Sequence, residues 1–142
     1  MSRVQLALNV QNLQESIAFY SKMFGTEPAK VREGYANFAI AEPPLKLVLI
    51  ETKADGSSEY QHLNHLGVEL ETAQLVEQAI VQFSNLGLVE KIEKNETCCF
   101  AVQDKVWMTS PDGAPWEYYT VLADAPSFRT NNAVVPGGDC CS

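Results

Sequence analysis

The feature that most limits the possible folds is an internal repeat of about 60 residues. Two segments, 4–10 and 65–70, alternate apolar residues with polar or small ones, which predicts a strand with one buried and one open face. A pattern with helical spacing follows each segment and ends at a glycine, Gly25 or Gly87. When Gln5 is aligned with His65, the two helical patterns also correspond. The chain therefore contains one structural unit twice.

Each repeat predicts a βαβββ unit. Asn12 and Thr72 stand where a helix N-cap is needed. The further strands are expected at 29–32, 35–41 and 45–51 in the first half and at 89–93, 98–109 and 116–121 in the second. The expected fold class is α+β, with two βαβββ modules curved around a shared metal-binding cleft. We expect one domain over 1–122, built from modules 3–52 and 62–122, and a flexible tail over 123–142.

Composition excludes several classes of function. The chain has 142 residues, 46% of them hydrophobic and 20% charged, as in an ordinary globular domain. Its formal net charge of -8 would repel nucleic acid and anionic membranes. The sequence has no apolar run of about 18 residues and no apparent signal peptide. A cytoplasmic protein acting on a small molecule is expected, as a monomer or a homodimer.

The four cysteines form two adjacent pairs, Cys98-Cys99 and Cys140-Cys141. A disulfide within either pair would strain the backbone, because neighbouring Cα atoms lie only about 3.8 Å apart. Free thiols are the expected state in a reducing cytosol. Thiols that converge can bind one soft atom. For Cys98 and Cys99, the alternative is that two small apolar side chains fill a strand.

Strand alternation places Gln5 and His65 on the same open face, and Glu117 can project to that face from a late strand. An imidazole, a carboxylate and an amide oxygen make a plausible divalent metal site, close in kind to the triad that favours non-haem Fe(II). Each residue also has a simpler role open to it: a hydrogen-bonded histidine, a solvated acid or a wetted amide. Glu51 is a lower-ranked ligand, and His62 is expected to be exposed.

Several segments resemble the vicinal oxygen chelate superfamily, which includes glyoxalase I and the extradiol dioxygenases. The resemblance spans roughly residues 3–122 and is carried by LNVQNLQESIAFYSKMFG, NHLGVEL and SPDGAPWEYY. The segments YANFAI, PLKLVLIE and TCCFAVQDKVWMTSPDG resemble its Fe(II)-dependent organoarsenical C-As lyases. The resemblance implies a metal held by Gln5, His65 and Glu117. It also implies that Cys98 and Cys99 bind the substrate arsenic.

The function implied by this resemblance is oxidative cleavage of a carbon–arsenic bond, with Fe(II) as cofactor and dioxygen as co-substrate. Methylarsonous acid would exchange its hydroxyls for two thiolates and yield arsenite. Lys105 is a candidate catalytic residue for an anionic intermediate or a closing loop, although a solvated turn lysine is the alternative. Two other functions stay open. One is a glyoxalase-like isomerase with a second carboxylate, and the other is a protein that only sequesters a drug or a soft metal ion.

Overall fold

The two repeats fold into matching halves of one curled sheet. The structure, a computed structural model, describes residues 2–52 and 61–128. The first half contains β1 (Arg3–Val10), α1 (Leu13–Phe24), β2 (Lys30–Arg32), β3 (Tyr35–Ile40) and β4 (Leu45–Glu51). The second contains β5 (Leu63–Glu69), α2 (Ala73–Asn85), β6 (Lys91–Cys98), β7 (Ala101–Thr109) and β8 (Pro115–Asp124). The predicted α+β class and both βαβββ modules are confirmed.

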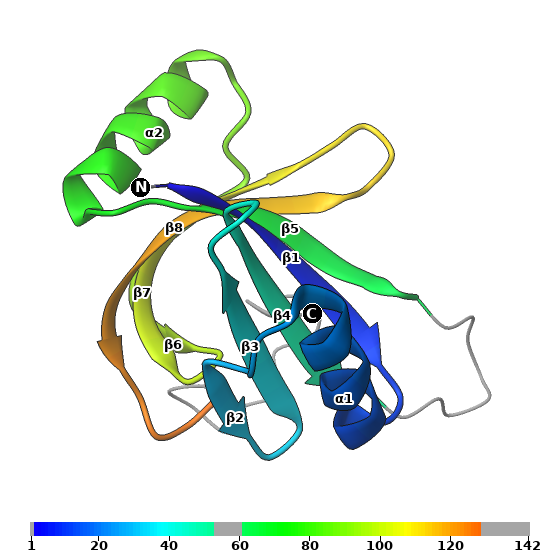
Figure 1. Cartoon of the computed structure of the whole chain (residues 1–142). Coiled ribbons are helices and arrows are strands. Elements are labelled where there is room, and N and C mark those ends of the chain that lie inside the picture. The colour runs from blue at the N-terminus through cyan, green and yellow to red at the C-terminus, as the bar shows by residue number, and fades with distance from the viewer. Residues whose placement is uncertain (1, 53–60, 129–142) are drawn as a thin grey trace.

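Strand pairing repeats from one module to the other. The strand order is β2-β3-β4-β1-β5-β8-β7-β6. In each module the first strand pairs in parallel with the last, β1 with β4 and β5 with β8. The modules join where β1 and β5 pair antiparallel, with Leu6 opposite Leu66. The sheet is therefore continuous, and its curl produces one concave face for both halves (Figure 1).

The helices cover the outer side of this sheet, one for each module (Figure 1). The side chain of Asn12 accepts a hydrogen bond from the backbone N–H of Glu15, and that of Thr72 accepts one from Leu75. These are the predicted caps. Gly25 follows α1 with a φ of 63°, a left-handed conformation that glycine adopts without steric cost. The helix ends therefore follow from local sequence.

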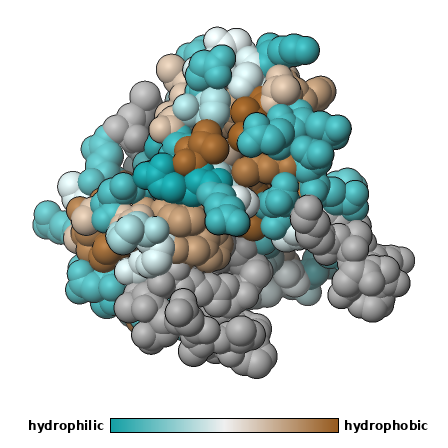
Figure 2. Space-filling view, turned by 90° about the horizontal axis from the view of Figure 1, so that it is seen from below, coloured by the Kyte–Doolittle hydropathy of each residue, from teal (hydrophilic) through white to brown (hydrophobic). Residues whose placement is uncertain are grey.

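Apolar side chains form separate clusters on the two sides of the sheet. The outer cluster of the first module includes Phe38 and Leu49 with α1 packed against it. The inner cluster includes Tyr35, Val48 and Trp107. On the face shown in Figure 2, hydrophilic residues border the hydrophobic ones over its coloured part. The described residues contain no helix long and apolar enough to cross a membrane.

The cysteine segment differs from the predicted strand over 98–109. β6 ends at Cys98, a turn follows at Cys99 and Phe100, and β7 begins at Ala101. Both turn residues have positive φ, 52° and 62°. β7 continues through Asp104 and Lys105. Just before the cysteines, Asn95 has a φ of 51° and the β6–β7 register shifts.

The predicted linker and the predicted tail fall largely outside the described residues. β8 runs to Asp124, and the backbone N–H of Ala125 donates to the carbonyl of Phe100. The predicted linker over 53–61 lies almost wholly outside the described ranges. Most of the predicted tail does too, including Cys140 and Cys141.

Candidate metal centre and thiol pair

Three predicted ligand residues meet on the concave face. Gln5 comes from β1, His65 from β5 and Glu117 from β8, and each is at most 3% exposed. Gln5 Nε2 lies 3.1 Å from His65 Nε2 and 2.8 Å from Glu117 Oε1. His65 Nε2 lies 3.3 Å from the same carboxylate oxygen. The side chains therefore form a small, buried triangle of polar atoms.

The contacts of Tyr119 bear on the orientation of the Gln5 amide. The Tyr119 hydroxyl contacts two acceptors, Gln5 Oε1 and Glu69 Oε2, but has only one hydrogen to donate. A half-turn of the Gln5 amide solves this, because Tyr119 then accepts from Nε2 and donates to Glu69. The same turn directs Gln5 Oε1 toward His65 and Glu117. Three lone pairs then face one point, an arrangement that a divalent cation can bind.

The spacing of the triangle fits a divalent ion. At metal–ligand bond lengths of about 2.1 Å, neighbouring ligands of an octahedral ion lie about 3.0 Å apart. The observed separations of 2.8, 3.1 and 3.3 Å bracket that value. Within the described ranges no group of three His, Cys, Asp or Glu side chains is arranged to hold a metal. A metal here would therefore depend on the Gln5 amide.

Only the second module has a carboxylate at this position of the repeat. Glu117 stands opposite Gly67 across the β5–β8 pair, and Val48 stands opposite Ala7 across the β1–β4 pair. Since Ala7 and Gly67 correspond in the repeat, Val48 occupies the position equivalent to Glu117. A valine cannot bind a metal. An ion bound by the other three residues would keep open coordination positions.

His65 is oriented by a chain of polar contacts. Its Nδ1 lies 2.8 Å from Asn64 Oδ1, an acceptor, so Nδ1 carries the proton and Nε2 keeps its lone pair. Asn64 donates in turn to Asn9 Oδ1 at 2.9 Å. The ring also packs edge-on against Trp107, with 5.4 Å between ring centroids. The imidazole is thus held with Nε2 toward the triangle.

Lys105 is buried, so the alternative of a solvated turn lysine is wrong. It is 1% exposed, and its Nζ donates to Glu117 Oε2 at 2.9 Å. Burial acts to raise the pKa of Glu117, but the Lys105 cation and the contacts of the carboxylate with Lys105 and His65 outweigh it and lower that pKa to about 2. Glu117 is therefore ionised at neutral pH. Lys105 engages one oxygen and leaves Oε1 in the triangle.

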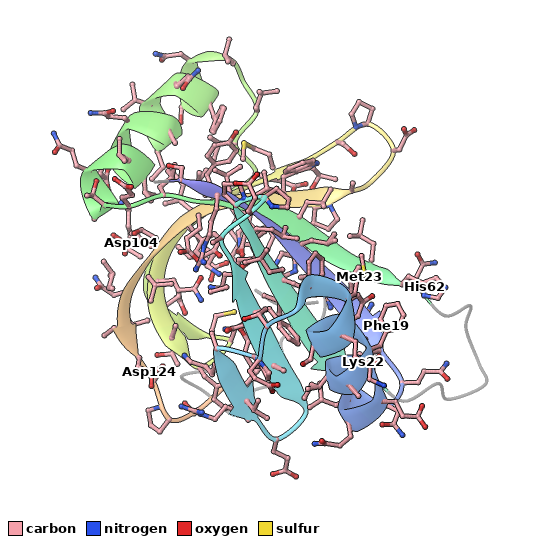
Figure 3. All side chains as sticks on the ribbon, in the orientation of Figure 1. Phe19, Lys22, Met23, His62, Asp104 and Asp124 are labelled. Atoms are coloured by element: carbon pink, nitrogen blue, oxygen red, sulfur yellow. The ribbon has the colours of Figure 1, made fainter. Side chains whose placement is uncertain are left out.

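Two competing candidates lie outside the site. Glu51 Oε2 accepts a hydrogen bond from the backbone N–H of Leu13, at the start of α1. Its ranking as a spare ligand is wrong, since its carboxylate serves a helix end instead. His62 is exposed, as expected, and stands next to α1 near Phe19 (Figure 3). Strand alternation thus separated His65 from His62 correctly.

Sequence reasoning missed four charged or polar residues on the same face: Arg3, Lys46, Glu69 and Tyr119. Glu69 accepts from Arg3 and Tyr119 and pairs with Lys46 at 3.1 Å. Although burial acts to raise it, these cations lower the pKa of Glu69. Burial and the nearby carboxylates raise the pKa of Tyr119 well above its usual value, so it keeps its proton. Strand alternation could have found Glu69, which lies four residues after His65, and Tyr119, two after Glu117.

The Cys98 and Cys99 sulfur atoms lie 3.4 Å apart, well beyond a disulfide bond of about 2.05 Å. The left-handed turn explains how neighbouring side chains approach each other, which a regular strand would prevent. Gln103 Nε2 donates to the Cys98 carbonyl at 2.9 Å, and Lys30 donates to the Phe100 carbonyl at 3.2 Å. The turn is therefore anchored at both ends.

Comparison with known proteins identifies the family of the chain. The sequence profile of the Glyoxalase/Bleomycin resistance protein/Dioxygenase superfamily matches residues 3–118. The chain belongs to this superfamily. A trivalent organoarsenical cleaving enzyme from Thermomonospora curvata is 51% identical, over 99% of this chain and the whole of that one. The cadmium-induced protein CadI from Mycobacterium tuberculosis is 56% identical, over 90% of this chain and 82% of its own length.

Solved structures support the superfamily fold. An extradiol ring-cleaving dioxygenase from B. fuscum aligns with a TM-score of 0.61 at 20% identity. The alignment covers 87% of this chain and 33% of the dioxygenase. This member of the superfamily therefore has the curled sheet of the dioxygenase in a shorter chain.

Gly67 leaves the space that the triangle needs. A Cβ at this position would lie 3.0 Å from Glu117 Cγ and 3.2 Å from Gln5 Nε2. We expect Gly67→Ala to displace both side chains and to lower the free energy of unfolding by about 1–3 kcal/mol. Urea denaturation measures this effect. An unchanged midpoint would show that neither neighbour is confined by Gly67.

Proposed function

We propose that this protein is a non-haem Fe(II)-dependent dioxygenase that cleaves the carbon–arsenic bond of trivalent organoarsenicals such as methylarsonous acid. The observation that carries the proposal is one concave sheet face that presents a sulfur pair and a triangle of nitrogen and oxygen ligands. Thiolates suit soft arsenic, whereas an imidazole, an amide and a carboxylate suit Fe(II). The 51% identity to an organoarsenical cleaving enzyme over the whole chain supports the same substrate class.

The cysteines bind the substrate in this proposal. The sulfur atoms lie 3.4 Å apart, and a bond from sulfur to a soft atom is about 2.3 Å long, as in a zinc–thiolate bond. Since two such bonds together are longer than the distance between the sulfur atoms, both sulfurs can bind the same atom. Each thiol displaces one hydroxyl of methylarsonous acid and releases water, and the methyl group stays on arsenic. The hydrogen bonds from Gln103 to the Cys98 carbonyl and from Lys30 to the Phe100 carbonyl hold the turn during this exchange.

The ligand residues hold the iron in this proposal. Gln5, His65 and Glu117 would bind it, and bound Fe(II) would supply open positions and the capacity to react with dioxygen. Lys105 acts as a positioning residue, because it keeps Glu117 ionised and directs Oε1 inward. Trp107 and the buried surroundings exclude water from His65. The overall reaction balances: methylarsonous acid and dioxygen give arsenous acid and formaldehyde.

A second candidate is sequestration of a soft ion such as Cd(II) without turnover. The close sulfur pair favours it, as does the similarity to a cadmium-induced protein. The isomerase alternative loses its second carboxylate, because Glu51 faces α1 and Val48 occupies the equivalent position in the repeat. The lyase accounts for both the sulfur pair and the ligand triangle.

The decisive experiment is anaerobic reconstitution with Fe(II), followed by methylarsonous acid and air. We expect arsenite and formaldehyde in equal amounts, with one dioxygen consumed for each. A sequestering protein would bind the arsenical without oxygen uptake, and an isomerase would need no oxygen. Absence of arsenite from the iron-loaded, reduced protein would contradict the lyase.

The proposed ligands predict distinct effects on iron content. His65→Ala and Glu117→Gln should each weaken Fe(II) binding by about 100-fold or more, measured as iron retained after anaerobic gel filtration. Glu117→Gln is preferred to Glu117→Ala, because it keeps the shape beside the buried Lys105. His62→Ala is the matched control and should bind iron normally. Loss of iron in the control with retention in His65→Ala would refute the assignment.

The proposed division of labour predicts the opposite behaviour for the cysteines. Cys98→Ser and Cys99→Ser should each lower the affinity for methylarsonous acid by about tenfold or more and leave the iron content unchanged. Loss of one of two sulfur–arsenic bonds is the reason. Calorimetric titration of reduced, anaerobic protein measures both variants. Wild-type affinity in both would contradict binding of arsenic by this pair.

A further inference from the structure

A hollow opens on the concave face beside Cys99. Its volume is about 280 Å³, and Cys99 forms part of its wall. Arg3, Lys30 and Lys46 also line it, with Glu69 as the one acidic residue among its described lining. We call this hollow the cationic pocket. Three cations against one acid stand out in a chain whose net charge is -8.

The positive charge of the pocket is only partly compensated. Glu69 is shared between Arg3, at 3.0 Å, and Lys46, at 3.1 Å. Two cations on one carboxylate leave one positive charge in excess. The Lys46 side chain is only 12% exposed, and this burial lowers its pKa although Glu69 acts to raise it, so an incoming anion would favour its charged form. Lys30 is paired with Asp124, which stands outside the lining residues.

The position of the pocket relates it to the proposed substrate. Cys99 stands at one side, and Lys46 is paired in register with Gln5 at the other. An organic group attached to arsenic on the cysteines would therefore have space to extend from Cys99 into this pocket toward Lys46. Pockets that bind small molecules commonly have volumes of about 300 Å³ or more. The volume of about 280 Å³ is close to this lower limit and accepts a group much larger than methyl.

We propose that the cationic pocket binds an anionic substituent on the organic group of the arsenical. The preferred substrates are then trivalent organoarsenicals whose carbon group bears a carboxylate or a similar anion. Lys46 and Arg3 would share this anion with Glu69, and Lys30 would approach it from β2. This inference rests on the proposed function, because it places the arsenic on Cys98 and Cys99.

A matched pair of probes tests the inference: phenylarsonous acid and 4-carboxyphenylarsonous acid. Both are titrated calorimetrically into reduced, iron-loaded, full-length protein without oxygen. We expect the carboxylated probe to bind about tenfold more tightly, and the advantage to shrink at high salt. Lys46→Met and Arg3→Met should each reduce the advantage at least threefold and leave binding of phenylarsonous acid nearly unchanged.

Lys22→Met is the matched control, since Lys22 is exposed on α1, on the outer side of the sheet (Figure 3). It should keep the full advantage of the carboxylated probe. Equal affinity of wild-type protein for both probes would overturn the cationic pocket and leave the proposed lyase standing. An advantage that survives in both Lys46→Met and Arg3→Met would also overturn it. Failure to bind either probe would refute the arsenical substrate itself.

Discussion

The antiparallel pairing of β1 with β5 is the contact on which the rest of the structure depends. It joins two repeats that each have only half of a concave face, and it places Gly67 between Gln5 and Glu117. Glycine at that point lets two polar side chains from the neighbouring strands approach each other. Residues 112 positions apart in sequence thereby reach 2.8 Å. Without this pairing the three predicted ligand residues would not meet.

Buried charge sets the second constraint. Glu117 is almost fully shielded from water, and an isolated carboxylate there would be strongly unfavourable. Lys105 compensates it from the neighbouring β7, and the two strands are in register with Lys105 beside Tyr119. The pair keeps one carboxylate oxygen occupied and the other inward. The same ion pair therefore stabilises the buried charge and orients Glu117 in the proposed metal centre.

The concave face separates two kinds of chemistry over a short distance. Nitrogen and oxygen ligands lie at the seam between modules, and the sulfur pair lies at a turn between β6 and β7. The charges of Arg3, Lys46 and Glu69 line the pocket that Cys99 also borders. Hard and soft ligands compete poorly for each other's preferred ions. Under our proposal, this difference lets one small protein hold iron and arsenic without exchanging them.

The sequence by itself determined the repeat, the helix ends and the faces of β1 and β5, because these depend on spacing and capping within a few residues. The prediction that Gln5 and His65 share one face is therefore confirmed, and His62 lies apart from them. Only the tertiary structure decided that Lys105 is buried against Glu117, that Glu51 faces α1, and that Cys99 bends out of its strand. Each of these depends on which distant strand lies alongside, and local periodicity carries no information about that. The cationic pocket arose in the same way, from side chains on strands of both modules.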